Sequence, residues 1–156
     1  MSERIGAIAP GLGVLILGYS AFEGIGSALM IPPIYILATM FYDDVASRAR
    51  AYLQANCAYC HSDGGEARTT GLDLTFDETS PMQLGVCKMP IAAGKAAEGQ
   101  YYDIVPGHPE QSILVYRMES TAPAIAMPEI GRSLEHFEAV QLVSDWINAM
   151  PAMNCQ

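Results

Sequence analysis

The stretch Cys57-Ala58-Tyr59-Cys60-His61 decides how the rest of the chain is expected to fold. Two cysteines three positions apart, followed directly by a histidine, have the spacing of a covalent attachment site for haem c. Each thiol can add to one vinyl group of the porphyrin, and the adjacent imidazole is then carried under the ring to the iron. The spacing is short because all three bonds are made to one macrocycle. We therefore expect one covalent haem c bound by Cys57, Cys60 and His61.

Two other uses of paired cysteines compete with this interpretation. A structural zinc site needs a second, similarly spaced pair of ligands, which Cys87 and Cys155 do not supply. A thioredoxin-like dithiol belongs in an alternating strand and helix context, and no such alternation surrounds residues 57–61. The motif therefore favours haem c.

Composition limits the class of partner. The chain of 156 residues allows one ordinary domain and an additional segment. Its 17 acidic and 8 basic side chains give a formal net charge of −9, which argues against nucleic acid as a partner. An acidic carrier is expected to dock on a basic surface of a redox protein, although the same charge also serves solubility alone.

The N-terminal region is strongly apolar. Residues 5–42 contain one charged side chain, Glu23. As a continuous helix they would extend about 57 Å, well beyond a hydrocarbon core of roughly 30 Å. Three interpretations stay open: a cleaved secretory signal, an uncleaved anchor with one span and a kinked or interfacial segment, and a hairpin of two spans. The anchor is favoured because the run is too long for a signal peptide, so we expect residues 1–42 to be embedded in membrane lipid and residues 43–156 to form the haem domain.

The haem domain is predicted to be all-α, with helices at both of its ends. Asp43 or Asp44 can cap the first helix, which leads directly into the motif. Residues 62–110 are rich in turn signals and are expected to wrap the haem as ordered loop. The predicted elements are a helix over 43–56, a short strand over 72–76, a short helix beginning at Pro109 and a last helix over 133–150. The last helix carries an apolar stripe expected to pack on the first helix, formed by Leu134, Phe137, Val140, Val143, Ile147 and Met150, with Trp146 beside it near the haem. Tyr52 and Tyr59 are expected in the core or over the porphyrin.

The iron needs a second axial ligand. A methionine opposite the histidine raises the reduction potential and suits an electron carrier. The candidates outside the apolar segment and the helical patterns are Met82, Met89 and Met127. Met127 is favoured because Pro128 disfavours helix at the preceding residue and keeps Met127 in an extended loop, and Met89, before another proline, is the next choice. Two rival ligands are weaker and are predicted to lie at the surface, His108 and His136.

Several further segments carry a family resemblance. They are Ile104-Val105-Pro106-Gly107-His108-Pro109 with Ser112, Tyr116-Arg117-Met118, Met127-Pro128 with Gly131, and Asp145-Trp146-Ile147. With these segments and the haem motif, residues 51–147 resemble class I monohaem cytochromes c, more specifically the cytochrome domains associated with quinoprotein-type dehydrogenases. The resemblance implies a cytochrome c-like helical fold, with His61 as the proximal and Met127 as the distal ligand of the iron. The apolar N-terminus lies outside it.

The resemblance also bears on the remaining cysteines. In that group a mid-domain cysteine and a C-terminal cysteine often occur together, which matches Cys87 and Cys155. Because haem c is matured in an oxidising compartment, a disulfide between them is expected, and two buried free thiols are the alternative. The first candidates to bind the haem propionates are Arg117 and Arg132, which flank the loop that contains Met127 (the ligand loop). Lys88 and Lys95 follow them.

These features predict a membrane-tethered electron-transfer protein rather than an enzyme, since no nucleophile or acid–base constellation stands near the motif. The expected location is the inner membrane, with the haem domain on the periplasmic side. There it would pass single electrons between membrane redox complexes, moving on its tether or fixed in a respiratory or photosynthetic assembly. The alternative is a haem-based sensor or small haem enzyme with a labile sixth ligand.

Overall fold

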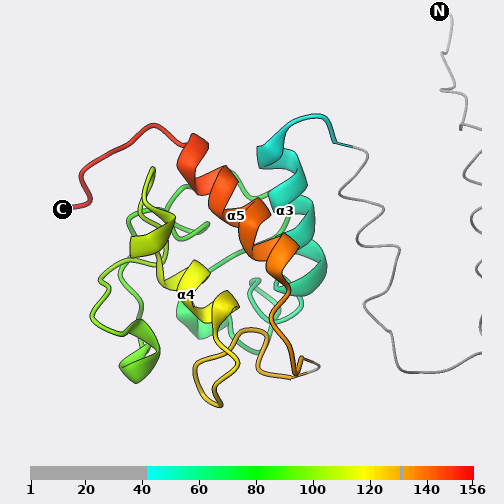
Figure 1. Cartoon of the computed structure of the whole chain (residues 1–156), viewed down its shortest axis with the longest axis vertical. Coiled ribbons are helices and arrows are strands. Elements are labelled where there is room, and N and C mark those ends of the chain that lie inside the picture. The colour runs from blue at the N-terminus through cyan, green and yellow to red at the C-terminus, as the bar shows by residue number, and fades with distance from the viewer. Residues whose placement is uncertain (1–41, 131) are drawn as a thin grey trace, which may run out of the picture. The chain divides into compact units, whose positions relative to one another are not determined.

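The computed structural model describes residues 42–130 and 132–156, in which three α-helices are present: α3 (Val45–Asn56), α4 (Ile113–Glu119) and α5 (Phe137–Ala149) (Figure 1). Three short 3-10 turns precede α4: η1 (Arg68–Thr70), η2 (Gly94–Ala97) and η3 (Pro109–Gln111). The described ranges contain no strand, only isolated bridges joining Val86 to Ile104 and Tyr102 to Ser112. The prediction of a helical fold is therefore confirmed for this part of the chain.

The strand predicted over residues 72–76 is wrong, because the backbone bonds of this segment go to different loops rather than to one neighbouring strand. Asp73 N–H donates to the carbonyl of Gln83, at 2.8 Å, and Leu74 N–H donates to the carbonyl of His61, at 2.9 Å. Leu74 is buried in the core. The alternation of apolar residues thus reports a half-buried loop.

Helix α3 begins where a capping side chain is available. The Asp44 carboxylate accepts a hydrogen bond of 2.7 Å from the backbone N–H of Ser47, so Asp44 is the N-cap. The core-facing residues of the helix include Ala49 and Leu53. Cys57 ends the helix, with its N–H bonded to the carbonyl of Leu53. The predicted first helix is confirmed, and it delivers the chain directly to the motif.

Helix α5 begins at Phe137 rather than at the predicted Ser133. The Arg132 guanidinium donates to the carbonyl oxygens of Met118 and Ser120 at the end of α4. Residues 133–136, which lie between Arg132 and α5, are not helical. The predicted stripe is buried at Val140, Val143 and Ile147, and Trp146 is buried with them. It is exposed at its start, with exposed fractions of 77% for Leu134 and 65% for Phe137.

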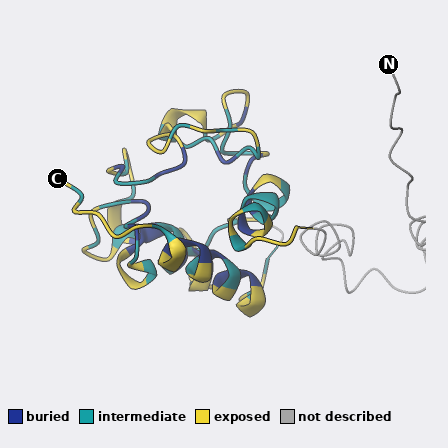
Figure 2. Ribbon diagram, turned by 90° about the horizontal axis from the view of Figure 1, so that it is seen from above, coloured by how far each residue is buried: buried dark blue, intermediate teal, exposed yellow. Residues whose placement is uncertain are grey.

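The core lies between the helices, as the buried inner faces in Figure 2 indicate. Helix α5 packs on both α3 and α4, which confirms the predicted packing of the last helix on the first. Met118 is buried in this core, as its helical pattern predicted. The buried cluster consists of Ala49, Leu53, Leu74, Ile104, Val115, Met118, Ala139, Val140, Val143, Trp146 and Ile147.

The loop after the motif is attached to α3 by one side chain. The Arg50 guanidinium donates to the carbonyl oxygens of Thr75 and Phe76, at 3.2 and 2.6 Å, and to that of Glu78. Gln54 accepts a hydrogen bond of 2.7 Å from the N–H of Phe76. These bonds supply partners for a segment that has none from regular secondary structure.

The predicted membrane segment, residues 1–42, lies outside the described residues except for Tyr42, whose ring stacks on Phe76 at 5.3 Å. In the part of the chain that the structure describes, no helix combines the length and apolar character needed to cross a membrane.

Candidate haem attachment site

The motif folds as one tight turn at the end of α3. The backbone N–H groups of Cys60 and His61 both donate to the carbonyl of Cys57, at 3.1 and 2.8 Å. Cys57 and Cys60 are free thiols, each half-buried. One turn therefore presents both thiols and the imidazole together, as attachment to a single macrocycle requires.

The aromatic residues of this region differ from the prediction in one case. Tyr59 lies in the turn between the two cysteines and is 85% exposed, so the predicted core position is wrong, while its position over the porphyrin stays a prediction. Tyr52 packs against the core, and its ring meets that of His136 at 5.6 Å. That contact leaves the His136 side chain only 19% exposed, so its predicted surface position is wrong, whereas His108 is 47% exposed and pairs with Glu110 as a surface residue.

Gly65 allows the chain to fold back over the motif. A Cβ atom at this position would lie 2.1 Å from the carbonyl oxygen of Cys60. The same carbonyl accepts a hydrogen bond of 2.9 Å from the N–H of Ala67. Only a residue without a side chain fits here, so Gly65 determines the shape of the turn that holds Cys60.

His61 is held at its ring and its backbone by the segment that follows. Its Nδ1 lies 3.2 Å from the hydroxyl oxygen of Thr70, and its carbonyl accepts the hydrogen bond from Leu74. Within residues 42–130 and 132–156, the second ring nitrogen, Nε2, makes no hydrogen bond. In metal-binding histidines one ring nitrogen is oriented by a neighbouring group while the other binds the metal, and the contact of Nδ1 with Thr70 is compatible with such a use.

The surroundings of His61 favour its neutral imidazole. Burial lowers the pKa of His61, and the positive charge of Arg117 lowers it further, while the carboxylate of Asp103 opposes the shift. Lys88 again lowers it and Glu129 raises it. Arg117 and Glu129, which lie before and after Met127 in the sequence, are thus among the charges that act on His61.

The cysteines of the chain fall into two kinds, free thiols in the motif and a bonded pair outside it. Burial, and then the neighbouring Cys60, raise the pKa of Cys57 to about 12, whereas redox dithiols have lowered values. Cys87 and Cys155 bond to each other and are not available to complete a zinc site. Within the described ranges, no group of three His, Cys, Asp or Glu side chains is placed to hold a metal ion.

Met127 lies in a loop that is attached to α4. Its N–H donates to the carbonyl of Arg117 at 2.9 Å, and the Arg117 Nε donates to the carbonyl of Ile125 at the same distance. Arg132 closes the far end of the loop through its bonds to the end of α4. Met127 is half-buried, whereas the other candidates, Met82 and Met89, are 56% and 65% exposed. Met127 is thus less exposed than Met82 and Met89, and its loop is fixed to α4 by hydrogen bonds.

The candidates for propionate binding have other partners in the structure. Arg117 donates to the carbonyl of Ile125 in the Met127 loop, Arg132 donates to carbonyls at the end of α4, and Lys88 pairs with Asp103. Lys95 stands exposed on η2. The sequence had suggested propionate binding for Arg117 and Arg132, and it did not predict that they hold backbone carbonyls. Their position on either side of Met127 was the feature that could have indicated this.

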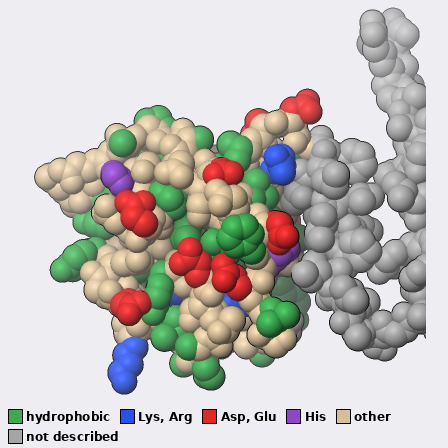
Figure 3. Space-filling view, viewed as in Figure 1, with side chains coloured by type: hydrophobic (Ala, Val, Ile, Leu, Met, Phe, Trp, Pro, Cys, Tyr) green, Lys and Arg blue, Asp and Glu red, His purple; other side chains and the backbone are tan. Residues whose placement is uncertain are grey.

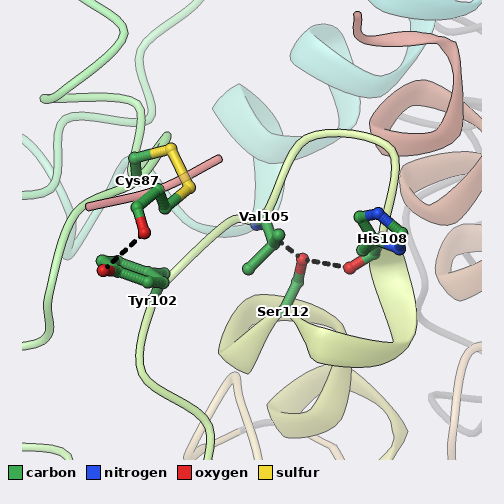
Figure 4. The surroundings of a disulfide bond; sticks show 6 residues. Cys87, Tyr102, Val105, His108 and Ser112 are labelled. Carbon is green, nitrogen blue, oxygen red and sulfur yellow. Dashed lines mark hydrogen bonds between the residues drawn. A yellow bond between two sulfur atoms is a disulfide. The ribbon is translucent and has the colours of Figure 1, made fainter. Parts of the chain in front are cut away.

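The sulfur atoms of Cys87 and Cys155 lie 1.95 Å apart, at disulfide-bonding distance, in agreement with the expected pairing (Figure 4). The Tyr102 hydroxyl donates to the carbonyl of Cys155 at 3.0 Å. In the same region Ser112, fully buried, accepts a hydrogen bond from the N–H of Val105 and donates to the carbonyl of His108, both at 2.9 Å. A cavity of about 630 Å³ lies beside the disulfide, and no residue of the haem motif lines it.

Comparisons of the chain with protein-family models, with curated proteins and with solved structures find no match. The case for function therefore depends on the residues of the chain and their arrangement.

Proposed function

We propose that the chain is a membrane-tethered electron-transfer protein that carries one covalent haem c, with His61 and Met127 as axial ligands. The observation that carries the proposal is the single turn that holds two free thiols and an imidazole whose Nε2 makes no hydrogen bond to the described residues. Cys57 and Cys60 would bind the haem covalently. When bound, the haem supplies one-electron oxidation and reduction at its iron.

The ligand loop has two tasks in this proposal. It would hold Met127 as the sixth ligand of the iron, and it would keep water from the iron. Its attachment to α4 through Arg117 and Arg132 supports both tasks, because a thioether is a weak ligand that must be held in position. A firmly held sixth ligand favours the carrier over the alternative of a haem sensor or small haem enzyme.

The surface is suited to a basic redox partner. The chain has a net charge of −9, and on the face shown in Figure 3 acidic side chains lie in several groups among apolar ones. Opposite charges accelerate the encounter of two proteins and make the rate fall as salt rises. We place the protein in the inner membrane, anchored in lipid by residues 5–42, with its haem domain on the periplasmic side and a larger membrane electron-transfer complex as its partner.

Absorption spectra of the full chain test this proposal, after production with a cytochrome c maturation system and extraction from the membrane. We expect haem that stays attached on denaturation, a far-red methionine-to-iron charge-transfer band in the ferric protein, and no binding of carbon monoxide to the ferrous protein. Met127→Ala should lose the band and bind carbon monoxide. Met89→Ala is the matched control, since Met89 also precedes a proline, and it should keep the band.

Two outcomes would contradict the proposal. Haem that acid and organic solvent extract from the protein would exclude thioether attachment by Cys57 and Cys60. A high-spin ferrous spectrum with ready binding of carbon monoxide by the unmodified protein would instead support the sensor or enzyme.

A further inference from the structure

The hydroxyl group of Thr70 has three polar neighbours. It lies 2.7 Å from the carbonyl oxygen of Ala67, 3.3 Å from the backbone nitrogen of Leu72 and 3.2 Å from Nδ1 of His61. A hydroxyl has one proton to donate and two lone pairs that accept. The roles of these neighbours therefore determine which hydrogen bonds can form.

The hydroxyl proton goes to Ala67. A carbonyl oxygen can only accept, and the 2.7 Å contact is the shortest of the three, so Thr70 donates its single proton there. The N–H of Leu72 can only donate, so it takes one lone pair. The second lone pair of the Thr70 hydroxyl is then left for His61. The hydrogen bond between them must therefore use a proton on Nδ1 of His61.

This arrangement determines the tautomer of His61. With the proton on Nδ1, the neutral imidazole has its free lone pair on Nε2, the nitrogen without a hydrogen bond within the described residues. A hydrogen-bond acceptor at Nδ1 also orients the ring, and it makes Nε2 a stronger electron-pair donor to iron.

The turn that carries Thr70 is closed by two backbone hydrogen bonds. The N–H groups of Thr70 and Gly71 donate back to Ala67 and Arg68, at 3.0 and 3.1 Å, and close η1. Gly71 has a φ of +69°, the left-handed conformation that glycine adopts without strain, and a Cβ there would lie 3.3 Å from Cε of Lys88. The Lys88 stem thus packs over the end of the turn, which keeps the hydroxyl oxygen in place.

We propose that Thr70 is the positioning residue for His61: its hydroxyl accepts the proton of Nδ1, presents Nε2 to the haem iron and lowers the reduction potential. This inference rests on the haem function proposed above. Stronger donation by the proximal ligand favours the ferric state, so removing the acceptor raises the potential. Changes in such partners alter metal binding by about 10- to 100-fold. A tenfold change in the preference for ferric iron corresponds to about 59 mV for a one-electron couple.

Three variants of the full-length holoprotein test the inference by redox titration. Thr70→Val keeps the shape of the side chain without the hydroxyl and should raise the midpoint potential by about 59 mV or more. Thr70→Ser keeps the hydroxyl and should restore a value near that of the unmodified protein. Thr69→Val is the matched control, because Thr69 is exposed in the same 3-10 turn, and it should leave the potential unchanged.

A second measurement detects the Nδ1 proton directly. In the ferrous holoprotein with ¹⁵N-labelled histidine, the Nδ1 proton of His61 should exchange slowly with deuterated solvent, and faster in Thr70→Val. An Nδ1 proton that exchanges within the dead time in the unmodified protein would overturn the inference. So would a Thr70→Val potential equal to that of the control. In both cases covalently attached haem would still leave the proposed function standing, whereas a chain without haem would refute that function.

Discussion

Lys88 and Asp103 form an ion pair in the interior, with 2.9 Å between Nζ and Oδ2 and side chains that are each 9% exposed. The backbone N–H of Asp103 also donates to the carbonyl of Lys88, at 2.8 Å, so two segments are joined twice. Burial raises the pKa of the Asp103 carboxyl, and the Lys88 ammonium opposes this shift. The charges of both residues act on His61. The pair therefore belongs to the electrostatic surroundings of the motif as well as to the fold.

Removing one partner of this pair is expected to be much worse than removing both. Asp103→Ala leaves a buried ammonium group without its counter-charge, and we expect a loss of about 3–5 kcal/mol in the free energy of unfolding. The double variant Lys88→Met/Asp103→Leu removes both charges and should lose far less. Denaturant titration of the single and double variants measures the difference. If the double variant loses as much stability as Lys88→Met and Asp103→Leu lose when made separately and added together, the two charges are not coupled.

The bond between Cys87 and Cys155 closes a loop with a sequence separation of 68. In the chain-entropy description, such a cross-link stabilises a protein by about 4 kcal/mol. We expect reduction to lower the denaturation midpoint accordingly, while Cys87→Ser/Cys155→Ser is less stable from the start and insensitive to reductant. Intact mass under non-reducing conditions provides the check, since a mass with two free thiols would contradict the bond.

Sequence patterns were sufficient where local chemistry decides the structure. The aspartate cap, the apolar face of α3 and the cysteine and histidine spacing are all short-range features, and α3 and the motif turn follow them. They failed where a distant side chain intervenes. Helix α5 begins at Phe137, after Arg132 has bonded to the end of α4, and no pattern within residues 133–136 indicates that these residues are not helical.

The same distinction holds for the candidate site. The sequence pointed to Cys57, Cys60 and His61, but Thr70 and Gly71 stood out only as a turn signal and Asp103 not at all. These residues matter because the folded chain brings them close to His61. The hydroxyl oxygen of Thr70, for example, lies 3.2 Å from Nδ1 of His61. The role of Met127 as a ligand and the anchor within residues 1–42 stay predictions.

The cap of α3 gives a pH dependence. Folding lowers the pKa of Asp44, chiefly through the hydrogen bond from Ser47, so the ionised cap stabilises the fold above the ordinary value of 3.8. That contribution is lost as the pH falls through the lower folded value. Asp44→Asn accepts the same hydrogen bond without titrating. The difference in unfolding midpoint between unmodified protein and variant should therefore shrink between neutral pH and about pH 3. A constant difference would show that the charge of Asp44 contributes nothing.

Two adjacent glycines provide a test of the motif turn. Gly65→Ala would place a methyl group 2.1 Å from the Cys60 carbonyl oxygen, so the turn must open, and we expect severalfold less covalently bound haem per chain. Gly64→Ala is the control, because nothing lies within 4 Å of a Cβ at that position. The ratio of haem absorbance to protein in purified full-length chain measures both. Equal haem content in the two variants would show that the turn tolerates the change.

The last prediction concerns the closure of the ligand loop. The Arg132 guanidinium donates to the carbonyl oxygens of Met118 and Ser120, and hydrogen bonds to charged groups contribute about 1.5–3 kcal/mol each. Arg132→Ala frees the end of the loop, so Met127 should leave the iron more often and ferrous protein should bind carbon monoxide faster. Arg132→Lys keeps the charge but not the planar fork, and should have an intermediate rate.

The exposed Arg68 provides the control for loss of one positive charge. Arg68→Ala should bind carbon monoxide as slowly as the unmodified protein, as measured by flash photolysis. If Arg132→Ala is equally slow, the loop is held by its other bonds, above all those that join Met127 and Ile125 to Arg117. In that case the Arg132 bonds act only on the end of α4, and the variant should lose stability without any change in ligand exchange.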